Sequence, residues 1–81
     1  MAVRIIVAGY GTQNNVRNAT EAVQGAFDDG KPSFQANNDL VGDPAVGQDK
    51  DLFIAWQTTS GETRMGVARE HSDQQILITD N

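Results

Sequence analysis

KDLFIAWQT, residues 50–58, is the stretch of sequence that decides the fold. On an extended chain, Leu52, Ile54 and Trp56 point to one face and Phe53 points to the other. Alternation of this kind, in a segment with aromatic and β-branched residues, predicts a β-strand. Because apolar side chains occur on both faces, we expect both faces of this strand to be at least partly covered.

Four further segments are predicted to be strands. Residues 4–8 form a β-branched run that is closed by glycines, and residues 33–36 form a short strand around one phenylalanine. Residues 63–68 alternate apolar and polar positions after a turn at residues 59–62, and residues 75–79 form the last strand. Together with the KDLFIAWQT strand, the last two are expected to form an antiparallel meander.

One helix is predicted over residues 16–27. Its apolar side chains fall three and four positions apart, as on one face of a helix: Val16, Ala19, Val23, Ala26 and Phe27. Asn14 or Asn15 can cap its first turn by accepting hydrogen bonds from backbone N–H groups. Gly30 suits the left-handed position that ends a helix, and Pro32 cannot continue one.

The order of elements favours one small, mainly β domain. Residues 37–49 are the longest irregular stretch, since Asn, Asp, Gly and Pro recur there and each favours a turn. The predicted order is therefore strand, helix, short strand, long loop and three-strand meander. We expect a single domain over residues 1–81, built as a small antiparallel β-sandwich with one short helix. A two-layer α+β arrangement is the alternative.

The composition argues against several kinds of partner. The chain has 81 residues, with 6 Lys and Arg against 11 Asp and Glu, and a formal net charge of -5. Nucleic-acid backbones and acidic membrane surfaces repel such a charge, so we expect neither as a partner. The apolar run at residues 3–8 is too short for a signal peptide or a membrane span. We therefore expect a cytoplasmic protein, or one secreted by an unconventional route, without membrane insertion.

The absence of cysteine affects how such a small chain gains stability. Without cysteine there is neither a disulfide nor a thiolate metal site. A chain of 81 residues has a small core, and small domains that lack such cross-links often gain stability by self-association. We therefore expect a homo-oligomer.

No segment carries a strong catalytic, cofactor or metal pattern. Residues 9–11 resemble the opening of a dinucleotide fingerprint, but Asn14 replaces its third glycine and the chain is too short for the parallel sheet. Residues 71–73 (His-Ser-Asp) are consecutive and cannot form a catalytic relay, and a lone histidine without cysteine does not support zinc. Aspartates between residues 39 and 51 fit no EF-hand, although calcium remains an alternative to a solvated loop. We expect a non-enzyme with no catalytic residue, cofactor or metal.

Neutral amide side chains are frequent, and they suit a carbohydrate ligand. Sugar hydroxyls pair with Asn and Gln without strong charge, and an aromatic ring offers an apolar face for stacking. The loops at residues 9–15 and 37–43 carry such amides. The predicted ligand contacts are Tyr10, Asn14, Asn15, Asn37, Asn38, Asp43 and Trp56. In the alternative interpretation, the amides cap and turn the backbone and Trp56 fills the core.

Part of the chain is similar to a known family. The most specific part of the shared pattern is Gly42-Asp43-Pro44, with Gly47 and Lys50 ahead of the KDLFIAWQT strand. Over most of residues 5–70, the chain resembles the C-terminal domain of certain mitochondrial DnaJ-like co-chaperones, whose relatives also occur in bacterial and fungal proteins without a chaperone part. It departs from the pattern at residues 18–20, Asn-Ala-Thr where the family tends to have Asp-Val-Thr, and at Val46, where the family tends to have a second proline.

This resemblance implies an interaction module of unassigned function. No J-domain is present in these residues, so the resemblance implies no chaperone activity, and the family offers no catalytic residue. It implies a structural loop around residues 42–50 in which Lys50 pairs with Asp43 or Asp49. It also leaves residues 16–27 as either helix or extended chain.

Two classes of function are therefore expected. The first is a non-enzymatic, lectin-like module that recognises a glycan through its polar loops, as an oligomer. The alternative is a protein-interaction or assembly domain that uses sheet edges or an apolar patch.

Overall fold

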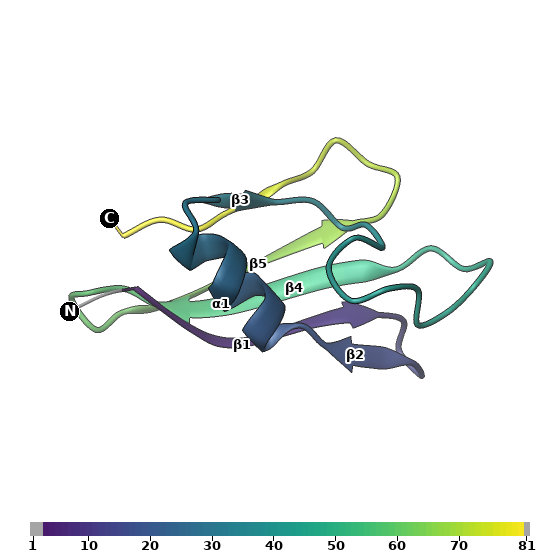
Figure 1. Ribbon diagram of the computed structural model, residues 1–81, viewed down its shortest axis with the longest axis horizontal. Coiled ribbons are helices and arrows are strands. Elements are labelled where there is room, and N and C mark those ends of the chain that lie inside the picture. Colours follow the sequence, from purple (N-terminus) through teal and green to yellow (C-terminus); the bar gives the residue numbers. More distant parts are fainter. Residues whose placement is uncertain (1–2, 81) are drawn as a thin grey trace.

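The computed structural model describes residues 3–80, which form mostly strands and one helix (Figure 1). The elements are β1 (Arg4–Gly11), β2 (Val16–Asn18), α1 (Thr20–Asp28), β3 (Ser33–Phe34), β4 (Asp51–Gln57), β5 (Thr63–Arg69) and β6 (Ile76–Leu77). Four strands form an antiparallel sheet in the order β2-β1-β4-β5, and β3 pairs with β6. The predicted small, mainly β fold with one short helix is confirmed.

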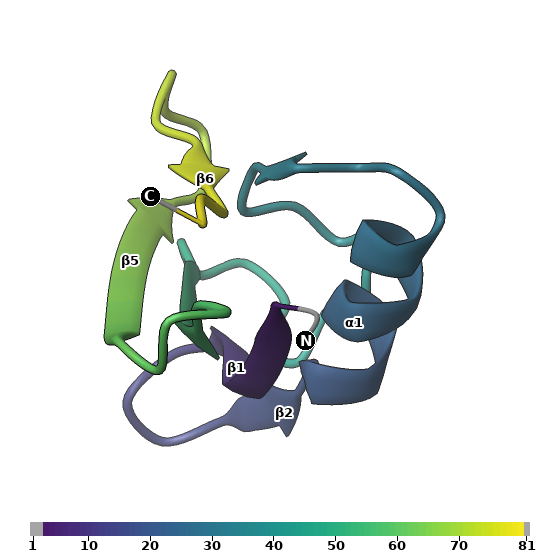
Figure 2. The ribbon, with the colours of Figure 1, turned by 90° about the vertical axis from the view of Figure 1, so that its left-hand side faces the viewer.

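The second layer covers one face of the four-stranded sheet. Figure 2 shows α1 and the β3–β6 pair on the same side of β1, β4 and β5. The core lies between these layers, and β4 supplies its centre, because Leu52 and Ile54 are fully buried and Trp56 is nearly so. Val23 of α1 and Phe34 of β3 close the core from the other side. The alternation in β4 thus correctly predicts that Leu52, Ile54 and Trp56 lie on one buried face of the strand.

Side chains of α1 satisfy the part of the β1 edge that β2 does not reach. β2 pairs only with the last three residues of β1. Further back, Ile5 N donates to Gln24 Oε1 (2.8 Å) and Ala8 N donates to Thr20 Oγ1 (2.9 Å). Ala19 N also donates to the Ala8 carbonyl oxygen (2.8 Å). Because unpaired edge groups invite another strand, these contacts close one edge of the sheet.

The predicted helix over residues 16–27 is wrong at its start. Residues 16–18 form β2, and the helix runs from Thr20 to Asp28. Asn14 and Asn15 lie in the turn that brings β2 back beside β1, where Asn15 N donates to the Thr12 carbonyl oxygen. The side chain that accepts a hydrogen bond at the helix start is Asn18, whose Oδ1 receives Thr20 N (2.8 Å). Strand pairing with β1 therefore overrides the three-and-four spacing.

Strand lengths also differ from those predicted. β1 continues through the glycines to residue 11, whereas β3 and β6 cover only two residues each. The predicted three-strand meander is wrong in its last strand, because β6 pairs with β3 and not with β5. Gly9 fits within β1 because it is paired with Phe53, and a Cβ at Gly9 would overlap the Phe53 ring. An aromatic side chain lying over a glycine on the next strand is a known way to keep glycine in a sheet. The long irregular stretch predicted at residues 37–49 is confirmed.

Candidate interaction surface

The two aromatic rings of the predicted sugar site are buried in the core. Tyr10 is 0% exposed and Trp56 is 4% exposed. Trp56 Nε1 donates to the Thr79 carbonyl oxygen (2.9 Å), so its one polar atom is also satisfied inside the protein. Neither ring has a face open for stacking on a sugar. The structure therefore corrects the assignment of both rings as ligand contacts, because both rings are packed inside the core.

The polar residues of the predicted site have mostly structural partners. Asn37 Oδ1 accepts a hydrogen bond from Asp39 N (2.9 Å), and Asn38 Oδ1 lies 2.8 Å from the Tyr10 hydroxyl. Asp43 Oδ1 accepts one from Ala45 N (3.1 Å). Asn14 and Asn15 are exposed and lie in the β1–β2 turn. The structure thus brings Tyr10, Asn38 and Asp43 to one end of the core, while the two turn asparagines stay outside this cluster.

A buried polar network lies where the long loop meets the sheet. Lys50 Nζ lies 3.0 Å from Asp43 Oδ1 and 3.1 Å from Glu70 Oε1. The same ammonium donates to the carbonyl oxygens of Ala45 (3.2 Å) and Gln48 (2.6 Å). Of the two pairings that the family resemblance implies for Lys50, the structure has the one with Asp43, and Glu70 is a further partner. A buried charge is tolerated when it is paired and hydrogen-bonded, and Lys50 meets both conditions.

The network fixes the charge of each of its members. Burial opposes the charged form of Glu70, but hydrogen bonds from Lys50 and Tyr10 outweigh it and lower the pKa of that carboxyl. Burial also opposes the charge on Lys50, yet hydrogen bonds to Asp43 and Glu70 raise its pKa. The hydrogen bond from Lys50 lowers the pKa of Asp43, and burial raises the pKa of Tyr10. None of these shifts brings a group towards neutral pH, so the network holds no poised acid or base.

A shallow hollow of about 340 Å³ lies over this network, and it contains the one group of side chains that resembles a metal site among residues 3–80. Asp49, Glu70 and His71 each offer a ligand atom, and these atoms lie within 4.8 Å of one another. Glu70 is already bonded to Lys50, whose ammonium would repel a divalent cation at this position. The carboxylate is thus committed to the network, and we assign no metal to the group.

Sequence reasoning does not locate the uncovered face of the four-stranded sheet, although it names an apolar patch as an alternative. On β5, Met65 and Val67 point outward and are 69% and 58% exposed. Gly66 and Ala68 point inward, because Ile76 packs directly over Gly66 and leaves no room for a larger side chain. The alternation of residues 63–68 correctly predicts that successive side chains point to opposite faces. It does not predict that Gly66 and Ala68, and not Met65 and Val67, face the core.

Apolar side chains continue across this face in two cross-strand rows. Val7, Ala55 and Met65 are paired in one row. Gly9, Phe53 and Val67 are paired in the next row, with Val16 of β2 against Gly9. We call these seven residues, Val7, Gly9, Val16, Phe53, Ala55, Met65 and Val67, the open face. A contiguous exposed apolar patch of this kind is typical of an interaction site.

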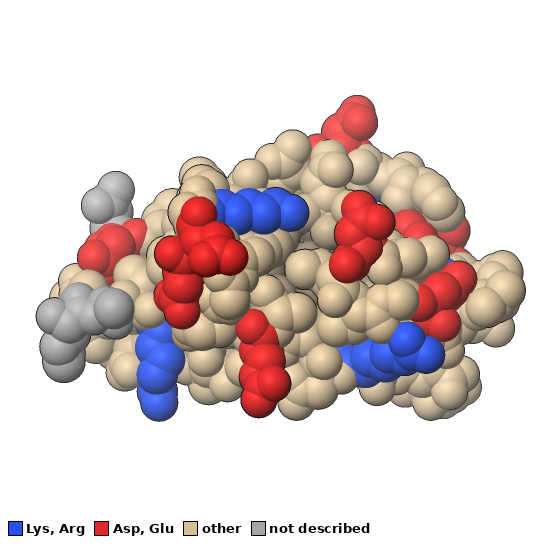
Figure 3. Space-filling model, viewed as in Figure 1, with Lys and Arg blue, Asp and Glu red and all other residues tan. Residues whose placement is uncertain are grey.

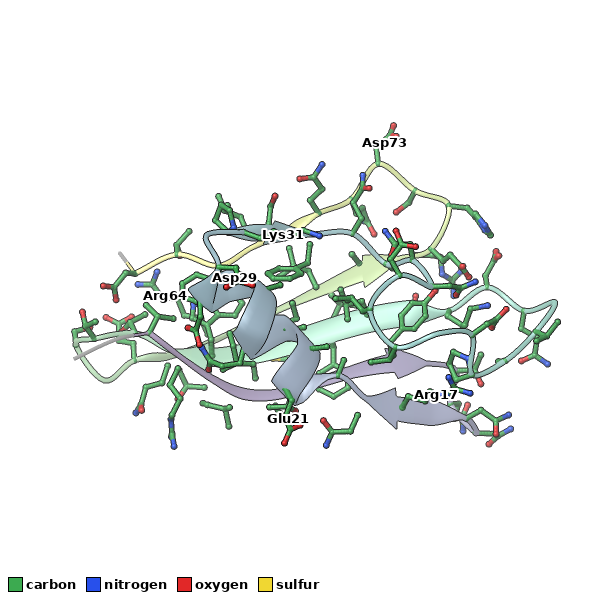
Figure 4. The ribbon with its side chains drawn as sticks, viewed as in Figure 1. Arg17, Glu21, Asp29, Lys31, Arg64 and Asp73 are labelled. Atoms are coloured by element: carbon green, nitrogen blue, oxygen red, sulfur yellow. The ribbon has the colours of Figure 1, made fainter. Side chains whose placement is uncertain are left out.

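Charged groups lie at the margin of the open face, not within it. At one end, Arg69 Nε donates to Asp51 Oδ1 (3.2 Å) on the neighbouring strand, and this pair is neutral overall. Acidic side chains are spread over the opposite, helix-bearing side of the molecule (Figure 3). Glu21 and Asp29, near the two ends of α1, and Asp73, in the turn after β5, are among them (Figure 4). Of the eleven acidic residues, only Asp51 lies in a strand of the four-stranded sheet, and it is paired with Arg69.

Comparison with known proteins gives no match: no family model, curated protein or solved structure is significantly similar to this chain. The similarity to the co-chaperone domain therefore stays a prediction. Within residues 3–80, no helix has the length and apolar character that crossing a bilayer requires.

Proposed function

We propose that the protein is a non-enzymatic interaction module that binds another protein surface through its open face. The observation that supports this most directly is the exposure of Met65 and Val67 beside Phe53 on a sheet whose other face holds the core. Antiparallel sheets usually place polar residues on a solvated face, so an apolar one favours a partner. The pKa shifts in the network around Lys50, none of which brings a group towards neutral pH, support a role without acid–base catalysis.

This proposal replaces carbohydrate binding as the preferred function. The stacking platform was the specific feature that favoured a sugar ligand, and burial of Tyr10 and Trp56 removes it. The amide side chains that remain are explained by turns and by the buried network. The apolar patch of the alternative interpretation is present.

A pair of matched substitutions tests the proposed function. Val67 lies on the open face and Val46 lies in the long loop, and both are exposed, at 58% and 84%. The tagged protein and the variants Val67→Glu and Val46→Glu are each incubated with a lysate of the source cells and with an untagged copy of the chain. We expect at least one protein to be retained by the wild type and by Val46→Glu but lost with Val67→Glu. Equal retention by all three would contradict the proposal.

A further inference from the structure

We propose that the partner on the open face is a second copy of this chain, so that two four-stranded sheets pack face to face in a symmetric dimer. This inference rests on the proposed function and names its partner. Two sheets of this kind pack about 10 Å apart through apolar side chains from their facing surfaces. A second copy supplies such a sheet by symmetry, since the two halves of a two-fold interface are the same patch.

The charge distribution favours a copy of the same chain on this face. A net charge of -5 would oppose self-association if the acidic groups faced each other. Ten of the eleven acidic residues lie on α1 or outside the strands, and Asp51, the one on a strand of this sheet, is paired with Arg69. Screening over about 8–10 Å then weakens repulsion between the acidic groups of the two copies.

The size of the face fits a weak, reversible dimer. β1, β4 and β5, with about seven residues each at about 3.4 Å, and the three residues of β2 give a face on the order of 400 Å² at a strand spacing of about 4.8 Å. Two such faces bury on the order of 800 Å², below the range of about 1,200–2,000 Å² for stable interfaces. We therefore expect an exchange between monomer and dimer at micromolar concentrations, not a permanent assembly.

A knob and a hollow on opposite margins of the face suggest how the copies are oriented. Met65, on the β5 margin, is the most exposed side chain of the open face. On the β1 margin, a hollow of about 480 Å³ is lined by Ile6, Val7, Asn18, Thr20 and Glu21. Val7 and Met65 belong to the same cross-strand row, with Ala55 between them. A two-fold axis along β4 therefore brings Met65 of each copy to the hollow beside Val7 of the other.

Sedimentation equilibrium over about a hundred-fold concentration range tests the dimer. We expect the mass of the wild type and of Val46→Glu to rise from that of the 8.7 kDa monomer towards twice this value. Val67→Glu would bury an unpaired charge at the interface, so its association should be weaker by more than about tenfold. Circular dichroism verifies that this variant folds, and Met65→Lys provides a second change on the same face with the opposite charge.

Cross-linking tests the orientation without background, because the natural chain has no cysteine. A mixture of Val7→Cys and Met65→Cys chains, treated with a short bismaleimide, should give the mixed dimer in high yield. The mixture of Val46→Cys and Met65→Cys is the control and should give little. A wild type that stays monomeric throughout would overturn the inference. Retention of a different protein by the open face would then still support the proposed function, so the two failures are distinguishable.

Discussion

Lys50 is a buried cation that links the long loop to the end of the sheet. Its ammonium group joins Asp43 of the loop to Glu70, which follows β5, and Glu70 is also reached by Tyr10 of β1. The Tyr10 hydroxyl lies 2.8 Å from Asn38 Oδ1 and 3.1 Å from Glu70 Oε2, two acceptors for its single proton. Residues from three separate parts of the chain thus depend on one another.

Removal of the Tyr10 hydroxyl should destabilise the fold. Tyr10→Phe keeps the ring in the core but leaves the buried Glu70 carboxylate without one of its donors. We expect the free energy of unfolding to fall by about 1–3 kcal/mol in urea titrations. Asn38→Ala leaves Glu70 as an acceptor for the hydroxyl and should cost less. An unchanged midpoint for Tyr10→Phe would show that the hydroxyl contributes nothing to stability.

The same network should limit stability at both ends of the pH range. The pKa values of Asp43 and Glu70 are lowered in the folded state, so their contribution is present at neutral pH and is lost as pH falls below about 4. The pKa values of Lys50 and Tyr10 are raised, so theirs is lost as pH rises above about 10. Urea midpoints against pH should show a plateau between these limits. Glu70→Gln should make the fall of the urea midpoint at acid pH smaller. Glu21→Gln, on the exposed part of α1, should leave this fall unchanged.

At the scale of elements, β5 determines which face of the sheet stays open. Gly66 faces the core because Ile76 of β6 packs on it, and a Cβ there would lie 2.9 Å from Ile76 Cγ2. Gly66→Ala should therefore lower the free energy of unfolding by about 1–3 kcal/mol through overpacking. Gly25→Ala in α1 meets no neighbouring atom and should raise it by about 0.5–1 kcal/mol. Thermal unfolding of the two variants is expected to shift in opposite directions, and a shift in the same direction would contradict this account of β5.

Sequence patterns predict the helices and strands better than they predict which segments pack or pair with one another. The alternation in KDLFIAWQT gives β4 and its buried side, whereas the pairing of Lys50 with Glu70 is not contained in any local pattern. The helical spacing of residues 16–27 is misleading at its start, since pairing with β1 turns residues 16–18 into a strand. The outward direction of Met65 depends on Ile76 packing over Gly66, a contact between segments that local alternation does not contain.

At the scale of the whole molecule, the fold has one covered and one uncovered sheet face. The covered face uses nearly all large apolar side chains that point to it, including the two aromatic rings of the predicted sugar site. Val16, Met65 and Val67 stay exposed on the open face, which we propose binds a second copy.

The most direct test is a methyl NMR spectrum of the protein recorded over a wide range of concentrations. The account predicts that the methyl signals of Val16, Met65 and Val67 shift or broaden as the concentration rises. The signals of Val46 and Leu77, which are also exposed but lie outside the open face, should stay unchanged. Changes confined to Val46 and Leu77, or no change in any of these signals, would contradict it.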